Sequence, residues 1–194
     1  AELEKYFKEE FRRGRKMVDL YEAVQHAPQL IPRLYLLITV GSVYIQSHED
    51  GSHKILEDLI EMLRAVQNPL RGLFIRYYFL KMCKDRLPDT GSEYESPGRG
   101  IEQAVEIIYT NLRESVFLWI RLNFGKEKNR KEKDRNDLKV LIGEGLQRLT
   151  SLDGVNLEVY KTIVLPKLLE MLRASKDSLA QQYLLDCMIQ GFPE

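Results

Sequence analysis

The sequence has few of the residues that build redox, metal or nucleophilic sites. Its 194 residues include only two cysteines, Cys83 and Cys187, and three histidines. The cysteines are far apart and lie among apolar residues, so we expect two buried free thiols in a reducing compartment. The sequence contains no Gly-rich phosphate loop, Gly-x-Ser-x-Gly elbow or Cys–His pairing. This shortage argues against an enzyme and against a cofactor site.

His48 and His53 are the only two histidines close in the sequence, with Glu49 and Asp50 between them. Gly51 places this pair across an expected turn, and no nearby cysteine completes a ligand set. We therefore interpret the segment as a solvated turn and expect no metal ion.

The sequence also lacks a net charge, because 29 Lys and Arg balance 29 Asp and Glu. This balance argues against a nucleic-acid partner, since binding to phosphates needs a basic surface. Two local clusters remain. Arg12–Lys16 is either an ordinary surface feature or a contact for an acidic partner. Lys126–Arg135, with six bases and three acids, is either a solvated helix with i,i+4 ion pairs or a contact for phosphate or acidic lipid headgroups.

No segment alternates polar and apolar residues with a period of two, so no strand is expected. Apolar residues instead recur at spacings of three and four, which predicts an all-α chain of eight to ten helices. The expected helices span residues 3–11, 17–24, 32–47, 55–66, 69–82, 101–119, 138–152, 156–174 and 179–189.

Two of these segments, 32–47 and 69–82, are apolar on nearly every side, whereas the others are apolar on one side. This contrast is typical of inner and outer helices in a stacked array. Pro32 and Pro69, which open the two inner helices, are 37 residues apart (69 − 32). That spacing is close to the helix-pair repeat of about 40–47 residues.

Local signals predict where the helices begin, bend and end. Asn68-Pro69 is a strong start signal, because an N-cap residue precedes a proline at the first helical position. We expect Pro166 to kink its helix, Gly143 and Gly145 to allow a close neighbour, and the polar segment Asp89–Gly100 to form a mobile surface loop. The other expected caps are a capping box of Asp19 and Glu22, Asn156 and Ser175.

Ile31–Gly41 is the most apolar stretch of the chain, and the apolar run continues to Ile45. A run of about 12 residues is too short to span a bilayer, and we interpret it as a buried helix. On a helical wheel its polar side consists of Tyr35, Thr39, Ser42 and Gln46.

Arg33 lies on the apolar side of this helix, in its first turn, where a cation gains nothing from the helix dipole. One explanation is structural: the aliphatic stem packs on Leu36 and Leu37 while the guanidinium reaches the C-terminal carbonyls of a neighbouring helix or an acid. The other explanation is a direct contact with a partner chain.

The segment Pro32-Arg33-Leu34-Tyr35-Leu36-Leu37 resembles the PRLYLL motif of the retromer large-subunit family. The resemblance extends to Gly14-Arg15-Lys16, Pro69–Phe74, Asp153–Asn156 and Leu179-Ala180-Gln181. It implies a long α-solenoid of HEAT-like antiparallel helix pairs, with residues 1–194 as a single fragment of its N-terminal third. The start without methionine and the abrupt end agree with a fragment.

The resemblance further implies a non-enzymatic scaffold of an endosomal sorting coat, cytoplasmic and peripherally attached to the endosome membrane through partners. Its expected partners are the arrestin-like retromer subunit, bound through Pro32, Arg33, Leu34, Tyr35, Leu36 and Leu37, and a sorting nexin, a Rab-family small GTPase and cargo tails. Two rival functions remain. One is a helical-repeat GTPase-activating domain that uses an exposed arginine, and the other is a nucleic-acid-binding helical repeat that uses the two basic clusters.

Overall fold

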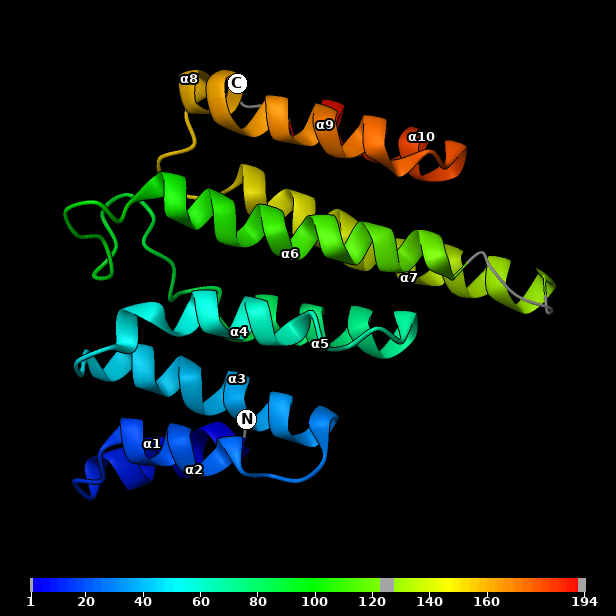
Figure 1. Cartoon of the computed structure of the whole chain (residues 1–194). Coiled ribbons are helices and arrows are strands. Elements are labelled where there is room, and N and C mark those ends of the chain that lie inside the picture. Colours follow the sequence, from blue (N-terminus) through cyan, green and yellow to red (C-terminus); the bar gives the residue numbers. More distant parts are fainter. Residues whose placement is uncertain (1, 123–127, 192–194) are drawn as a thin grey trace. The chain divides into compact units, whose positions relative to one another are not determined.

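The structure, a computed structural model, describes residues 2–122 and 128–191, and only the backbone of residues 128–132 (Figure 1). Regular structure in these residues is helical, and the one β-type feature is an isolated bridge between Ser96 and Arg99. The elements are α1 (Glu2–Arg12), α2 (Met17–Gln25), α3 (Leu30–Ser47), η1 (Ser52–Lys54), α4 (Ile55–Leu63), α5 (Pro69–Met82), α6 (Ile101–Arg121), α7 (Lys128–Thr150), α8 (Leu157–Val159), η2 (Tyr160–Val164), α9 (Leu165–Ser175) and α10 (Ser178–Gln190).

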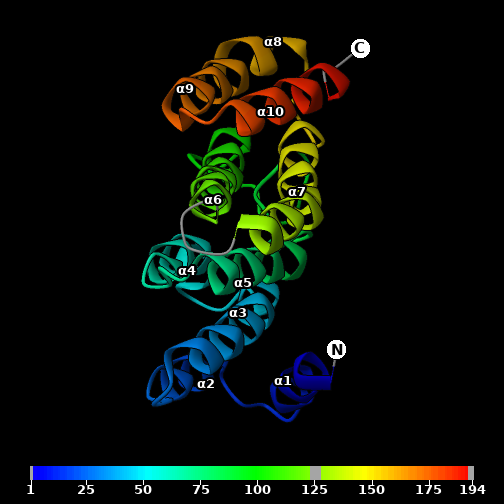
Figure 2. The ribbon, with the colours of Figure 1, turned by 90° about the vertical axis from the view of Figure 1, so that its right-hand side faces the viewer.

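The chain divides into two compact units. Unit 1 contains residues 1–66 and 78–86, and unit 2 contains residues 67–77 and 87–194, so that helix α5 contributes to both. Within each unit, successive helices run antiparallel, with α8, η2 and α9 continuing one another as a single helix (Figures 1 and 2). The expected fold class, an all-α array of antiparallel helix pairs typical of an α-solenoid, is confirmed for the described residues.

Helix α3 is the centre of unit 1, where α1, α2 and α4 pack against it. Ten of its residues, Leu34 and those from Leu37 to Ile45, are buried. Gly41 allows the close approach, because a Cβ there would lie 2.9 Å from Ile55 Cγ2 and 3.2 Å from Leu59 Cδ1. At 18 residues, α3 is longer than the run we expected, and by length and composition it could cross a membrane. The core helix of a globular unit meets the same criterion, and 56% of this helix is buried inside the protein.

Helix α2 begins at Met17, so the expected capping box of Asp19 and Glu22 is wrong. The helix has no local side-chain cap. Its first N–H groups instead donate to Glu49: Met17 N lies 3.1 and 3.0 Å from Oε1 and Oε2, and Val18 N lies 3.4 Å from Oε2. A carboxylate that follows the end of α3 therefore caps α2, which a search for local signals could not find.

Unit 2 is built on the antiparallel pair α6 and α7, against which α9 and α10 pack. Trp119, 1% exposed, is its largest fully buried side chain. The predicted close approach at Gly143 and Gly145 is confirmed, because added Cβ atoms would lie 2.5 Å from Tyr183 Oη and 3.1 Å from Leu112 Cδ1.

The start signals at Asn68 and Asn156 are confirmed, and the helix around Pro166 is irregular. Asn68 Oδ1 accepts from Arg71 N at 3.0 Å, and Asn156 Oδ1 accepts from Val159 N at 2.9 Å. Between α8 and α9 the helix widens into the π-helical turn η2, and Pro166 follows this turn in the first turn of α9. The proline therefore sits where its missing N–H is tolerated, and the break precedes it.

The cap of α10 is Asp177 and not Ser175. Asp177 Oδ1 accepts from Ala180 N at 2.8 Å. Ser175 is the last residue of α9, and its hydroxyl donates to Leu172 O at 2.7 Å.

The charged segment Lys126–Arg135 lies largely outside the described residues, because Lys126 and Glu127 and the side chains of residues 128–132 are not described. At its end, Arg135 contradicts the expectation of a solvated face, because it is only 4% exposed. Its Nη2 donates to Asp177 Oδ1 at 2.8 Å, its guanidinium carbon lies 5.0 Å from the centre of the Trp119 ring, and its carbonyl accepts from Trp119 Nε1 at 2.8 Å. Arg135 therefore joins α6, α7 and the start of α10.

The loop between α5 and α6, which we expected to be a mobile surface loop, carries several hydrogen bonds. Thr90 N donates to Asp153 O at 2.9 Å, and Gly91 N donates to Glu95 Oε2 at 2.8 Å. Gly154, with φ at +100°, lies against Thr90, whose Cβ would be 2.8 Å from an added Cβ. The loop is thus attached to the turn before α8.

Candidate partner-binding site

The PRLYLL segment occupies the first two turns of α3. Some of its side chains are buried and the others are accessible to solvent. Leu34 and Leu37 are each 1% exposed and belong to the core of unit 1. Pro32 is exposed, and Tyr35 and Leu36 are partly exposed. A helix places residues three and four apart on one face, so the motif can support the core and offer a surface at once.

Arg33 is partly exposed, and its Nη1 donates a hydrogen bond to the carbonyl of Ala27 at 3.2 Å. Ala27 lies two residues beyond the end of α2. The guanidinium thus satisfies a carbonyl at the C-terminal end of a neighbouring helix, as the structural explanation expects. Because this hydrogen bond engages the guanidinium, Arg33 is poorly suited to be the exposed arginine of a GTPase-activating domain.

The polar side of α3 is mostly buried, in part against the end of α5. Thr39 and Ser42 are 0% and 2% exposed. Thr39 Oγ1 donates to Tyr35 O at 2.7 Å and lies 2.7 Å from Tyr78 Oη, and Ser42 Oγ donates to Met82 O at 3.1 Å. Because a threonine hydroxyl carries a single hydrogen, Tyr78 must be the donor to Thr39. The polar residues of α3 are therefore satisfied within unit 1.

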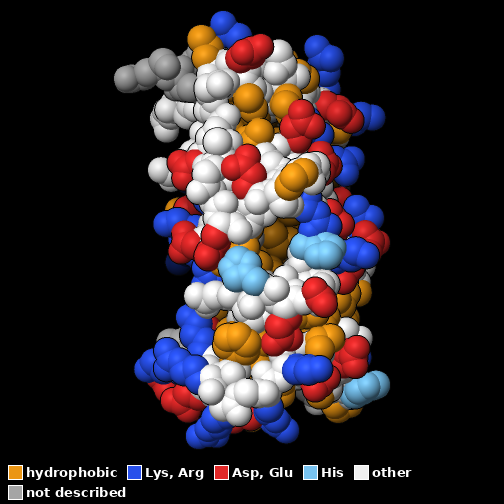
Figure 3. Space-filling view, turned by 90° about the vertical axis from the view of Figure 1, so that its left-hand side faces the viewer, with side chains coloured by type: hydrophobic (Ala, Val, Ile, Leu, Met, Phe, Trp, Pro, Cys, Tyr) orange, Lys and Arg blue, Asp and Glu red, His pale blue; other side chains and the backbone are white. Residues whose placement is uncertain are grey.

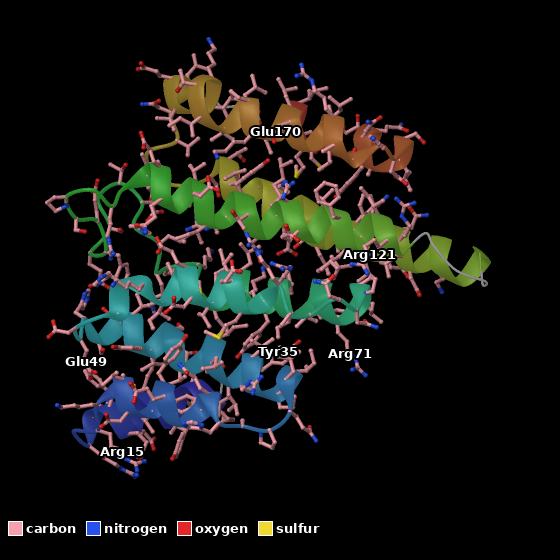
Figure 4. All side chains as sticks on the ribbon, in the orientation of Figure 1. Arg15, Tyr35, Glu49, Arg71, Arg121 and Glu170 are labelled. Atoms are coloured by element: carbon pink, nitrogen blue, oxygen red, sulfur yellow. The ribbon has the colours of Figure 1, made fainter. Side chains whose placement is uncertain are left out.

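Tyr78 extends the site beyond the sequence motif. Its ring meets the ring of Tyr35 edge to face, with centroids 4.9 Å apart. In Figure 4, Tyr35 lies on the first turns of α3, on the side toward α5. Sequence reasoning placed Tyr78 only among the apolar residues of its helix and had no signal that it pairs with the motif.

The electrostatics of this site are simple. Burial, and then the neighbouring Tyr78, raise the pKa of Tyr35 above its ordinary value. Tyr35 is therefore neutral at physiological pH, and Arg33 supplies the one formal charge of the motif. Such a surface suits contact with a protein partner better than acid–base chemistry.

The basic cluster at residues 12–16 is partly neutralised within its own unit. Arg13 Nη1 and Arg15 Nη1 lie 2.8 and 2.9 Å from the two carboxylate oxygens of Glu10, which is buried. On the face shown in Figure 3, Lys and Arg side chains are interspersed with Asp and Glu. An even mixture of charge gives little support to the nucleic-acid rival.

Two further sequence predictions concern ligands and thiols. In the part of the chain that the structure describes, no group of three His, Cys, Asp or Glu residues is arranged to hold a metal ion. Both cysteines are free, and Cys83 is buried as expected. Cys187 is partly exposed, which corrects the expectation of two buried thiols.

Comparison with known proteins gives one consistent result. The family model described as vacuolar protein sorting-associated protein 35 matches residues 1–194. The chain is 48% identical to vacuolar protein sorting-associated protein 35A of Arabidopsis thaliana over 99% of its length, and 45% identical to the Dictyostelium discoideum protein of the same family over 99%. A Schizosaccharomyces pombe relative is 39% identical over 92% of the chain.

The chain spans about a quarter of the length of these relatives: 25% of the first two and 22% of the third. The match nevertheless covers every described element, including α3 and its motif. On these grounds, the chain belongs to the vacuolar protein sorting-associated protein 35 family.

Proposed function

We propose that this chain is a non-enzymatic scaffold segment of the retromer endosomal sorting coat, and that the start of α3 attaches the arrestin-like subunit. Family membership supports a role in protein sorting, because the relatives are named for vacuolar protein sorting. The observation that carries the attachment site is the division of the motif: Leu34 and Leu37 fix α3 in the core, while Pro32, Tyr35 and Leu36 remain accessible.

In this proposal Arg33 supports partner binding indirectly, by stabilising the local structure of unit 1. By binding the carbonyl of Ala27, it fixes the connection between α2 and α3 beside the accessible residues. Loss of Arg33 removes this hydrogen bond between two partly exposed groups, which costs about 0.5–1.5 kcal/mol,. The direct contacts are then made by Pro32, Tyr35 and Leu36, whose apolar and aromatic surface suits the centre of a protein interface.

The remaining partners in this proposal are a sorting nexin, a Rab-family small GTPase and cargo tails, and they rest on family resemblance alone. The same holds for a cytoplasmic protein attached peripherally to endosomes through its partners. Rigid stacked helix pairs support such a role, because they offer long surfaces without needing to close on themselves.

Isothermal titration calorimetry with the purified arrestin-like subunit tests the attachment site. Tyr35→Ala and Leu36→Ala are each expected to weaken binding at least about tenfold. Leu36→Ala should leave the melting temperature unchanged because Leu36 is partly exposed, whereas Tyr35→Ala also loses the ring contact with Tyr78 and should lower it. Leu157→Ala removes a similarly exposed apolar side chain from unit 2 and serves as the matched control. Unchanged affinity in both α3 variants would remove this surface from the proposal.

Arg33→Ala distinguishes a structural role of the arginine from a direct contact with the partner. A structural role predicts that Arg33→Ala loses binding together with thermal stability, since the carbonyl of Ala27 loses its donor. A direct contact predicts lost binding at an unchanged melting temperature, measured by circular dichroism.

A further inference from the structure

Helices α7 and α10 run parallel in unit 2 and enclose a groove with two cavities. The first has a volume of about 160 Å³ and has buried Trp119 in its lining. The second has a volume of about 430 Å³ and contacts Cys187 and Gly191. Tyr183 lines both cavities. Figure 2 shows α7 and α10 next to each other.

The residues that line the groove repeat at spacings of three and four on both helices. On α7 they run from Asn136 through Lys139, Val140, Gly143 and Glu144 to Gln147, and α10 repeats the same spacing from Leu179 to Gln190. Each helix therefore lines the groove with a single face. The eleven steps from 136 to 147 correspond to about 16 Å of helix, which is the length of about five residues of an extended chain.

Gly143 accounts for the depth of the groove. It has no side chain to fill the space, and an added Cβ would lie 2.5 Å from Tyr183 Oη. The tyrosine therefore extends from α10 to the backbone of α7 and separates the cavities. Val140 and Leu179, 52% and 42% exposed, add apolar surface to the second and first cavity respectively.

Four amide side chains border this apolar surface: Asn136, Gln147, Gln182 and Gln190. All four are exposed, and among the described residues none of these side chains has a hydrogen-bond partner. An amide group both donates and accepts, as each peptide unit of an extended chain does. Two such amides at each cavity match the alternating donors and acceptors of a bound backbone.

The charges in the groove favour a cation. The lining contains two acids, Glu144 and Asp186, and one base, Lys139. The ammonium of Lys139 already lies 5.9 Å from the centre of the Tyr183 ring, whereas Asp186 has no ion-pair partner in the described part of the chain. A carboxylate that forms no ion pair, beside an apolar cavity, suits a positively charged side chain next to an apolar one.

We propose that the α7–α10 groove binds a short extended segment of a partner protein, with an apolar or aromatic side chain in the second cavity and a Lys or Arg beside Asp186. The four amides bind the backbone of this segment, and Asp186 selects the cation. The proposal goes beyond attachment at α3, because the groove shares no residue with the PRLYLL motif.

The first step of the test is selection of random peptides of about twelve residues, displayed on phage, on the 194-residue chain. Recovered peptides are expected to share an aromatic or large aliphatic residue close to a Lys or Arg. Failure to enrich any peptide, or enrichment of acidic ones, would overturn the proposal.

The second step measures the selected peptides by fluorescence anisotropy on groove variants. Asp186→Lys is expected to weaken binding about tenfold, because it removes the ionic contact. The double variant Gln147→Ala with Gln190→Ala is expected to weaken binding by a similar factor, because it removes two amide contacts. Matched controls are Glu9→Lys and the pair Gln25→Ala and Gln46→Ala, which change exposed residues of unit 1. Equal binding to groove variants and controls would contradict the proposed site.

Sedimentation velocity distinguishes a peptide from a second copy of this chain. A wild-type dimer that Asp186→Lys dissociates would assign the groove to self-association and would overturn the proposal. Equal melting temperatures of all variants by circular dichroism ensure that lost binding reflects the groove, because the altered side chains are exposed.

Discussion

Both carboxylate oxygens of Glu49 accept hydrogen bonds from the backbone N–H of Met17, at 3.1 and 3.0 Å, across 32 residues of sequence. The carboxylate lies at the positive end of the α2 dipole and satisfies N–H groups that no local side chain caps,. In Figure 4, Glu49 lies at the turn after α3, at the same end of unit 1 as Arg15, which shortly precedes α2. One side chain thus couples the end of the motif helix to the start of its neighbour.

Replacement of this cap should destabilise unit 1. Glu49→Ala is expected to lower the free energy of unfolding by about 1–2 kcal/mol, because the first N–H groups of α2 lose their acceptor and the dipole loses its anion. Glu49→Gln keeps one acceptor oxygen and should lose less. Urea unfolding provides the measurement, and Glu9→Ala, on the exposed side of α1, is the control. Equal stability of the Glu49→Ala protein and the wild type would show that the cap contributes nothing.

The hydroxyl pair of Thr39 and Tyr78 should show energetic coupling. Thr39→Val and Tyr78→Phe each remove one partner of a part-buried hydrogen bond, and each is expected to cost about 1 kcal/mol,. The double variant should cost less than the sum, because the same bond is lost only once. A double-mutant cycle from urea unfolding measures this difference, and additive losses would contradict the coupling.

Gly154 and Gly91 offer a matched pair of substitutions. Both have positive φ, +100° and +79°, but only Gly154 has a neighbour, Thr90, where a Cβ would be added. Alanine at either position should cost about 1–2 kcal/mol in backbone strain, and Gly154→Ala should cost about 1–3 kcal/mol more through overlap with Thr90. Thermal unfolding compares the two variants. Thr90→Gly should recover part of the extra loss in the Gly154→Ala protein; no recovery would place the cause elsewhere.

The buried pair of Arg135 and Asp177 should be important for the stability of unit 2. Asp177→Ala is expected to cost about 3–5 kcal/mol, because it leaves a buried guanidinium without its anion and α10 without its cap. Asp177→Ser restores a capping oxygen and should recover about 1 kcal/mol of that loss. Arg113→Met breaks the more exposed pair with Glu114 and should cost less than about 1 kcal/mol. Chemical denaturation ranks the three, and a small effect of Asp177→Ala would refute the role assigned to Arg135.

Alkaline pH should destabilise the protein. Burial raises the pKa of the Cys83 thiol from 9.0 to about 12 and that of Tyr183 from 10.0 to about 12. Both groups are neutral when protonated, so the unfolded chain loses these protons at lower pH than the folded chain does. Their contribution is complete below pH 9 and is lost progressively as the pH rises from 9 to 12,. Urea unfolding at several pH values measures the fall, and Cys83→Ala should reduce its slope.

The same burial predicts selective alkylation of the cysteines. Iodoacetamide at mildly alkaline pH is expected to modify Cys187, which is partly exposed, and to leave Cys83 unmodified until the protein unfolds,. Peptide mass spectrometry identifies the modified residue. Modification of Cys83 in the folded protein would contradict its burial.

Local signals determined much of the fold. The spacings of apolar residues predicted most helices close to the observed ones, although α7 begins at Lys128, ten residues before the expected start at 138. The Asn68-Pro69 and Asn156 starts were correct because each cap bonds a backbone N–H three residues away. The same spacings made α3 a central helix. These features depend on interactions within one or two turns, which the order of residues specifies directly.

The sequence by itself thus determined the helices, the central place of α3 in unit 1, and a family motif at the start of α3. Only the tertiary structure decided which polar groups are buried and which partners satisfy them. Glu49 caps α2, and Tyr78 forms a hydrogen bond with Thr39. Arg135, which belongs to a charged segment, is buried and forms an ion pair with Asp177. It also decided that Leu34 and Leu37 belong to the core while Pro32, Tyr35 and Leu36 stay accessible. The physical reason is distance along the chain. These partners are 32 to 42 residues apart, and a pairing across that separation depends on how helices pack and not on any local pattern,.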